Sequence, residues 1–349
     1  MPPRRRRNRT VEQVAEVEDG IAVQDLAVRH LLLVPSTVDI ESVDIALRDR
    51  LPGSDLFGTG EINLGRHSRI SGPYELSMED AVDAGVPMPW TVCYCLEAPF
   101  EREDPPIPGV DDRDGFAYAF PDGLPWRDEG RALHLLVSLA RRLSGAVRVA
   151  GSLELIQPDP DRAVDYVIHS PTWLDPDVLV GLVARELPSA VLAVDGQDWI
   201  GPPDEAYSGE TVRDDIASDP LTPQELYDLH ASADNVDMTV LNEDDIIDAF
   251  AIVGDLGWDG VIEVLVHLTD PDEPSVADQP WAEDDVVTYE VRWQCPDPAE
   301  RENRYPSDAF RQSRARVAPL VRSTAAAIVE AAGGVVLDED GFSVDRYTL

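Results

Sequence analysis

Hydrophobic residues in this chain of 349 residues form two kinds of pattern, one typical of strands and one typical of helices, and segments of the two kinds alternate along the sequence. A continuous apolar run at 31–34 favours a short buried strand. Over 39–51 the apolar residues recur at spacings of three and four, which is typical of one face of a helix. Asp39 precedes this helix, where its carboxylate can accept a hydrogen bond from an otherwise unpaired helical N–H. The pattern predicts a strand, a turn and a capped amphipathic helix.

The same pattern recurs later in the chain. An apolar strand at 164–169 leads into a helix over 175–187, and Pro176 falls at its first position, where a missing N–H breaks no helical hydrogen bond. Such self-similarity indicates an internal duplication. Without any gap, the two segments align Pro35 with Pro171, Ser36 with Thr172, Asp39 with Asp175, and Leu51-Pro52 with Leu187-Pro188.

Two further pairs of segments keep the same order. A helix over 131–143, a glycine and a strand at 146–150 match a helix within 312–331, two glycines and a strand at 334–337. The acidic helix start at 77–84 resembles Leu241-Asn242 with the acids that follow it. Pro319 either kinks the later helix or marks its true start, because a proline cannot donate a helical hydrogen bond.

Alternation and residue preference place the remaining strands. They are predicted at 90–97, 116–120, 190–194, 261–268 and 286–294, with a glycine-rich loop at 53–65. The fold class that follows is α/β (α+β): two tandem, internally duplicated units, each a ferredoxin-like or related sandwich with a mixed β-sheet and helices on one face.

The domain boundaries follow from composition. Residues 1–25 are a basic, disordered tail and a short lead-in, residues 26–158 the first unit, and residues 159–349 the second. The second unit contains an insertion near 204–236 with nine acidic residues against Arg213 alone. A second acidic loop spans 270–285 and has seven acids and no basic residue.

Charge excludes several classes of function. The chain has 68 acidic and 28 basic residues, a formal net charge of −40, and no lysine. Such a surface repels nucleic-acid phosphates, and the missing lysine excludes a phosphate-loop lysine, a lysine Schiff base and a Ser–Lys dyad. The acidity has two explanations: solubility or adaptation to salt, and attraction of a basic partner. The even spread of acidic residues favours the first.

No apolar run approaches the roughly 18 residues of a membrane helix. The arginines at 4–9 are followed by an acidic, polar segment rather than an apolar one, so a signal peptide is not expected. We therefore expect no membrane association and a cytoplasmic location.

The candidate chemistry is sparse. None of the six histidines has the spacing that brings a pair onto one metal ion, so each is expected to be structural unless His30, His169 and His267 converge in space. Cys93 and Cys95 alternate along a strand and share a face, which favours two core residues over a redox pair or a soft-metal site completed by Cys295.

Two acidic turns, at 111–115 and 338–341, have fragments of a calcium-loop pattern without its first and last ligands, and we interpret them as solvated turns. The glycines near 57–65 lack the spacing of a dinucleotide loop, and no G-x-S-x-G motif occurs. We therefore assign no catalytic, cofactor-binding or metal-binding residue.

The function expected from these observations is a non-enzymatic binding module, immunity- or inhibitor-like, that engages a basic protein partner through 204–236 and 270–285. Substitutions that would map such a surface are at Asp214, Asp215, Asp284 and Asp285. The alternative is an enzyme or small-molecule binder that uses carboxylates in a pocket between the two units. In that case His169 or the acids around Asp80 and Asp245 would line a deep cleft. The sequence does not specify the oligomeric state.

Overall fold

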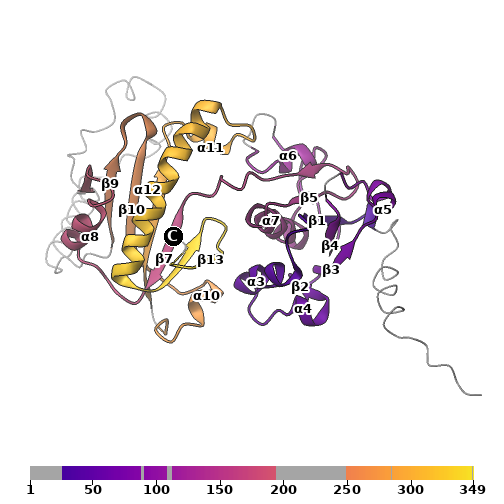
Figure 1. The fold of residues 1–349 in the computed structure, drawn as a ribbon, viewed down its shortest axis with the longest axis horizontal. Helices are drawn as coiled ribbons and strands as arrows, with labels where there is room; N and C mark the ends of the chain where they lie inside the picture. The colour runs from indigo at the N-terminus through magenta and orange to yellow at the C-terminus, as the bar shows by residue number, and fades with distance from the viewer. Residues whose placement is uncertain (1–25, 88–89, 108–111, 194–248, 284, 348) are drawn as a thin grey trace, which may run out of the picture.

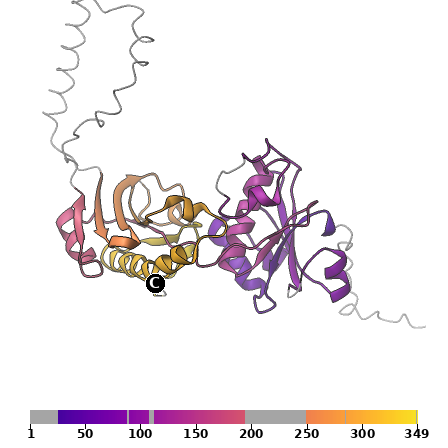
Figure 2. The same ribbon diagram turned by 90° about the horizontal axis from the view of Figure 1, so that it is seen from above.

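The computed structural model describes residues 26–87, 90–107, 112–193, 249–283, 285–347 and 349. It contains two antiparallel β-sheets with helices packed on them, which lie side by side in both views (Figures 1 and 2). We call the sheet of residues 30–156 and its helices the first unit, and the sheet of residues 166–344 and its helices the second. The α+β class is confirmed.

The first sheet is built around β1 (His30–Val34), which pairs with β4 (Val92–Glu97) on one side and β5 (Ala146–Arg148) on the other. Its outer strands are β2 (Glu61–Asn63), β3 (Arg69–Glu75) and β6 (Leu155–Ile156). The helices of this unit are α3 (Ile40–Arg50), α4 (Leu56–Thr59), α5 (Met78–Asp83), α6 (Phe116–Ala119) and α7 (Arg127–Arg142).

Strand β1 is buried on both faces, which explains its unbroken apolar sequence. Leu32 and Val34 pack against α3 and α7 in the main core, whereas Leu31 and Leu33 belong to a smaller core on the opposite face. Ala81 of α5 belongs to this smaller core, so helices lie on both faces of the first sheet and the expectation of one covered face was wrong here. Helix α3 begins as predicted, because the Asp39 carboxylate accepts a hydrogen bond from the Ser42 N–H at 2.8 Å.

The second sheet has the strand order β13-β12-β7-β11-β10-β9-β8. These strands are β7 (Tyr166–Ser170), β8 (Ala190–Ala193), β9 (Ala249–Asp255), β10 (Val261–Thr269), β11 (Val286–Gln294), β12 (Val335–Asp338) and β13 (Ser343–Val344). Helices α8 (Pro176–Val183) and α12 (Asp308–Ala332) cover one face (Figure 1). The short helices are η2 (Gly257–Asp259), α10 (Pro274–Ala277) and α11 (Pro298–Glu302).

The two sheets share an order of strands. In each, the first strand of the unit lies centrally, with the last strand of a three-stranded meander on one side and the strand after the long helix on the other. The expectation of mixed sheets was wrong, because every strand pairing among the described residues is antiparallel.

The predicted strand at 116–120 is instead helix α6. The carboxylate of Asp112 accepts hydrogen bonds from the N–H groups of Ala117 and Tyr118, and the Phe116 and Phe120 rings stack one turn apart at 6.1 Å. A local cap therefore outweighed the alternating pattern. The glycine-rich loop at 53–65 contains α4 and β2, and neither β3 nor β9 was predicted.

Helix α12 runs through Pro319 and begins at Asp308, where Ser307 accepts a hydrogen bond from the Phe310 N–H at 3.2 Å. The alternative in which Pro319 marks the start of the helix was therefore wrong. The helix tolerates the lost hydrogen bond because its other face is buried, with Val317 and Val321 in the second core.

The turn between β12 and β13 reaches into the first unit, and we call residues 338–343 the clasp. Phe342 is fully buried in the main core of the first unit. Arg50 of α3 donates a hydrogen bond to the Gly341 carbonyl at 3.0 Å, and Arg141 of α7 forms an ion pair with Asp340. The interpretation of this acidic turn as solvated was wrong, because its groups meet partners across the unit boundary.

The interpretation of the other acidic turn, at 111–115 in the first unit, as solvated was also wrong. Asp114 pairs with the same buried Arg141, and Arg113 forms an ion pair with Glu339 of the clasp. Asp112 caps α6 as described above. The two acidic turns therefore meet at the junction of the units, where arginines neutralise them.

Candidate functional site

The face of the second sheet opposite α8 and α12 carries polar side chains. Because neighbouring residues of a strand point to opposite faces, Ile168 and Tyr289 enter the core whereas His169 and Thr288 face outward. The strand register places His169 of β7, Thr288 of β11 and His267 of β10 side by side. Convergence was considered for His30, His169 and His267. Of these, His169 and His267 lie on one surface, whereas His30 lies in the other unit.

This surface forms the floor of a cleft of about 550 Å³, which we call the acidic cleft. The loop at 270–273 and the clasp form its walls, and Arg50 of the first unit lies at its edge. Its lining contains two arginines, Arg50 and Arg292, against eight carboxylates: Asp165, Asp270, Asp272, Glu273, Glu290, Asp338, Glu339 and Asp340.

Several of these carboxylates have arginine partners. Asp165 pairs with Arg301 at 2.6 Å, and Glu339 lies 3.2 Å from the same guanidinium. Burial opposes the charge of Glu339, yet Arg113 and Arg301 outweigh it and hold the pKa of this carboxyl below its usual value. The base of the cleft is thus a neutralised network that fixes the clasp rather than a ligand site.

The carboxylates of the loop after β10 are not neutralised in this way. Asp270 and Asp272 are exposed, and among the described residues neither carboxylate has a hydrogen-bond or ion-pair partner. Glu273 lies 3.7 Å from Arg50, a loose contact across the unit boundary. The mouth of the cleft therefore presents unneutralised negative charge.

The floor contains a chain of hydrogen bonds. His169 Nδ1 lies 3.1 Å from Thr288 Oγ1, which lies 2.6 Å from Thr269 Oγ1. Burial lowers the pKa of His169, and the nearby Glu273 and Glu290 only partly offset it, so its imidazole is neutral at pH 7. His267 Nε2 lies 3.1 Å from Glu290, whose carboxylate also pairs with Arg292.

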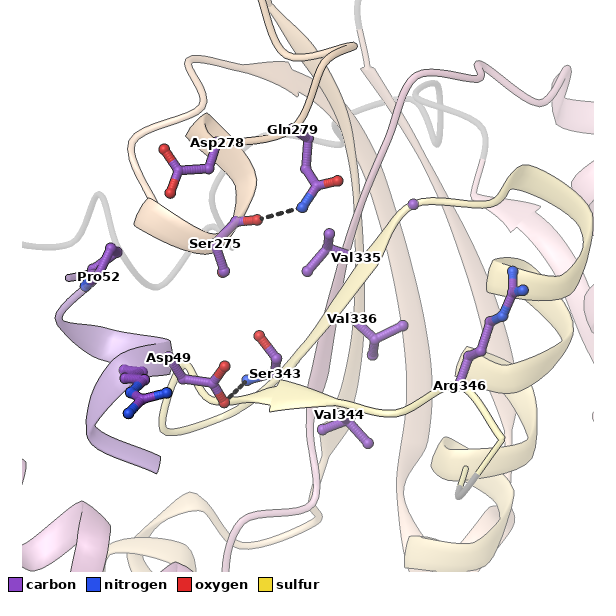
Figure 3. A pocket seen from close by; sticks show the side chains of 12 residues that line it. Asp49, Pro52, Ser275, Asp278, Gln279, Val335, Val336, Ser343, Val344 and Arg346 are labelled. Carbon is purple, nitrogen blue, oxygen red and sulfur yellow. Dashed lines mark hydrogen bonds between the residues drawn. The ribbon is translucent and has the colours of Figure 1, made fainter. Parts of the chain in front are cut away.

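A second hollow of about 450 Å³ lies between α3, α10 and the β12–β13 hairpin (Figure 3). Asp49 accepts a hydrogen bond from the Ser343 N–H at 3.1 Å, and Gln279 donates one to the Ser275 carbonyl at 3.0 Å. Its acid nearest the hairpin is therefore already engaged, and we interpret this hollow as part of the seam between the units.

The other predicted candidates lie elsewhere. His67 is exposed, His134 packs its ring against Phe116 at 4.3 Å, and His230 lies outside the described residues. Asp80 accepts a hydrogen bond from Ser77 Oγ at the start of α5, away from the cleft, and Asp245 lies outside the described residues.

Cys93 and Cys95 share a face of β4, as predicted, and both are buried in the smaller core of the first unit. Burial raises the pKa of the Cys93 thiol to about 12, so it is protonated and unreactive at pH 7. Cys295 packs against the core of the second unit. No cluster of three or more His, Cys, Asp or Glu able to hold a metal ion occurs among the described residues.

The acidic insertion 204–236, with Asp214 and Asp215, and Asp284 lie outside the described residues. Asp285 is exposed just before β11 and does not line the cleft. Of the two acidic segments expected to bind a partner, 270–285 is described apart from Asp284, and its Asp270, Asp272 and Glu273 line the cleft.

Sequence reasoning missed Arg50, Glu290 and Arg292 as residues of the cleft. A signal was available for the last two, because Thr288, Glu290 and Arg292 are polar at alternate positions of an apolar strand, which indicates one uncovered face. Arg50 comes from the other unit, and no local pattern could place it there.

Comparison with known proteins gave no match to a family model, to a curated protein or to a solved structure. Within the part of the chain that the structure describes, no helix is long and apolar enough to cross a membrane.

Proposed function

We propose that this chain is a non-enzymatic binding module, and that its acidic cleft receives a basic segment of a protein partner. The observation that carries the proposal is a pair of carboxylates, Asp270 and Asp272, that have no partner among the described residues and lie at the mouth of a cleft with eight acids against two arginines. An arginine or lysine side chain supplies the charge and the hydrogen-bond donors that these oxygens lack.

The arrangement suits recognition of a flexible basic side chain. Within the described part of the chain, the ion pair of Glu273 is the loose contact with Arg50, which is itself partly exposed, so an incoming guanidinium can replace that arginine without leaving it buried. Deeper in the cleft, Glu290 and the His169–Thr288 pair offer acceptors to a side chain that enters. The net charge of −40 accelerates the approach of a basic partner and excludes acidic ones.

The test is titration of the full-length protein with the tripeptide amide Arg-Gly-Arg, followed by calorimetry. The double substitution Asp270→Asn with Asp272→Asn should weaken binding by about tenfold, because it removes two charge-assisted contacts. Raising the salt concentration from about 0.05 to about 0.5 M should weaken wild-type binding as well, because exposed charges are screened.

A matched control separates the cleft from the overall charge. Asp177→Asn with Glu330→Gln removes the same two charges from exposed positions on α8 and α12, on the opposite face of the sheet. This variant should bind the tripeptide within about twofold of wild type. Equal weakening by both double variants would contradict the proposal, as would the absence of binding by wild type.

A second candidate function is an enzyme or small-molecule binder that uses the same cleft, and one observation favours it. His169 lines the cleft as a neutral imidazole whose Nδ1 is held by Thr288, which is how an acid–base histidine is oriented. A small molecule that raises the unfolding temperature of wild type but not of His169→Gln would support this alternative.

We also propose that the two units derive from one ancestral sandwich, related to but not identical with the ferredoxin-like arrangement. The common strand order and the matching positions of α3 with α8 and of α7 with α12 support this. A boundary between the units near residue 158 and a cytoplasmic location are part of the same proposal.

A further inference from the structure

A basic pocket lies on the helix-covered side of the second unit, away from the acidic cleft. It has a volume of about 390 Å³ and lies between α12 and the segment 161–166 that leads into β7. Three arginines, Arg311, Arg314 and Arg322, line it from one stripe of α12. This concentration of positive charge is unexpected in a chain with a net charge of −40.

Arg314 is the buried member of this set, with 6% of its surface exposed. Its Nη2 donates to Asp159 at 2.6 Å, whereas its buried Nη1 has no acceptor among the described residues. A buried guanidinium N–H without an acceptor destabilises the folded state, and such groups in folded proteins call for an explanation. A bound anion next to this side chain would supply the acceptor.

Arg322 is the accessible member. It is exposed, and its Nε donates a long hydrogen bond to the Tyr166 hydroxyl at 3.4 Å. Within the described part of the chain no carboxylate forms an ion pair with it. By contrast, Arg311 is engaged by Asp308 and by the Pro306 carbonyl at 2.9 Å. Arg322 therefore has a free guanidinium edge that can bind a planar or tetrahedral oxyanion.

The proline in α12 adds a complementary group. Pro319 has no N–H, so the carbonyl of Ala315, one turn earlier, loses its helical partner, and both residues line the pocket. Such a carbonyl accepts a hydrogen bond from a hydroxyl or amine of a ligand. Asp161, also at the pocket, repels anions, so two guanidiniums rather than one are needed to hold a negative group there.

We propose that this pocket binds a small molecule with a phosphate or carboxylate group, held between Arg314 and Arg322. The volume matches that of small ligand pockets, which begin near about 300 Å³. The Ala315 carbonyl contributes a contact to a neutral, hydrogen-donating part of the ligand. The two cavities share Tyr166, but none of the three arginines of this pocket lines the acidic cleft, so the inference stands independently of the proposed function.

The test uses the full-length protein and two probes, pyrophosphate and malonate, at a constant ionic strength of about 0.15 M set with sodium chloride. Binding is measured by calorimetry and by the shift of the unfolding temperature. Pyrophosphate alone would identify a phosphate-bearing ligand and malonate alone a carboxylate. In Arg322→Gln the affinity for the bound probe should fall by at least about tenfold. Arg322 is exposed, so this variant is expected to fold.

The control is Arg316→Gln, which removes the same charge from the same helix. Arg316 is exposed, pairs with Asp259 at 2.5 Å, and does not line the pocket. Its affinity for the probe should stay within about twofold of wild type. The proposal is overturned if neither probe binds below about 10 mM, or if Arg316→Gln weakens binding as much as Arg322→Gln.

Discussion

His30 lies at the centre of a buried hydrogen-bond network in the first unit. The Ala150 N–H donates to its Nδ1 at 3.0 Å, so that nitrogen carries no proton, and its Nε2 donates to Glu129 at 3.0 Å. Glu129 also accepts a hydrogen bond from the Glu101 N–H at 2.8 Å and pairs with Arg102. The geometry requires a neutral imidazole, because protonation of Nδ1 would place two donors face to face.

We therefore expect the protein to lose stability as the pH falls below about 6.5. Burial, the largest effect, and the nearby Arg102 and Arg148 lower the pKa of His30 below its ordinary value of 6.5, despite Glu129. A group with a lowered folded-state pKa contributes its full stability above its unfolded-state pKa and loses it as the pH decreases. The measurement is the urea unfolding free energy between about pH 7.5 and about pH 5.5.

The variant His30→Gln should be less stable than wild type by about 1.5–3 kcal/mol at pH 7.5 and should show a weaker pH dependence. His67→Gln replaces an exposed histidine and should keep the wild-type slope. His134 and His169 also have lowered pKa values, so some slope remains in every variant. A slope in His30→Gln equal to that of wild type would refute the assignment.

At the residue scale, the sequence predicted that histidines and Cys93 would be structural, but it could not identify their partners. His30 and Glu129 are 99 positions apart, and the acceptors of a buried arginine such as Arg148 are backbone carbonyls, at Leu26 and Ala27. Only long-range packing brings such groups together, whereas residue patterns report the local neighbourhood.

The clasp joins the two units at the scale of elements. Phe342 packs in the main core of the first unit although the β12–β13 hairpin that carries it belongs to the second. Gly341 has a φ of 77°, a conformation that favours glycine, and any Cβ there would collide with the Arg50 guanidinium that binds its carbonyl. The first unit is therefore completed by the C-terminal hairpin, and we expect both units to unfold in one transition.

Phe342→Ala should lower the unfolding free energy by about 3–5 kcal/mol, because it leaves a cavity in the first core. It should also separate the transitions of the two units, which calorimetry would detect as a broadened or split peak. Phe100→Ala makes the same change at a side chain that is 82% exposed and should cost less than about 1 kcal/mol. A single sharp transition in Phe342→Ala at wild-type temperature would exclude this role of the clasp.

Elements with strong local signals were predicted and others were not. Helix α3 has a capping Asp39 and a regular apolar face, and β11 was predicted with its observed bounds. Strand β3 was missed because Gly72 and Pro73 interrupt it, and they coincide with an irregularity in its pairing with β4. The acidic cleft was not predictable as a site, since its floor, wall and edge come from distant segments.

At the scale of the whole molecule, acidity is spread over the chain, and several arginines lie at the junction. Arg113, Arg141 and Arg142 of the first unit each pair with a carboxylate of the clasp. These arginines neutralise the boundary, but 68 acidic residues against 28 basic ones leave the rest of the molecule self-repelling. Composition alone predicted this repulsion, but not where the positive charge gathers.

Screening this repulsion should stabilise the protein. The Debye length falls from about 30 Å at about 0.01 M salt to about 10 Å at about 0.1 M, so repulsion between distant carboxylates weakens over that range. We expect the urea midpoint to rise between these concentrations and then to level off. Sodium and potassium chloride should act alike, whereas sucrose at matched osmolality should not reproduce the early rise.

The shape of this curve also separates the two explanations of the acidity. Levelling near about 0.1–0.2 M would fit screening alone and would leave the cleft acids available for a partner at ordinary salt. A rise that continues into molar salt, with unfolding in its absence, would instead identify adaptation to a saline environment. A midpoint unaffected by salt would contradict both explanations. In that case two effects of salt would cancel: it would weaken the stabilising ion pairs of the junction by as much as it weakens the destabilising repulsion between dispersed carboxylates.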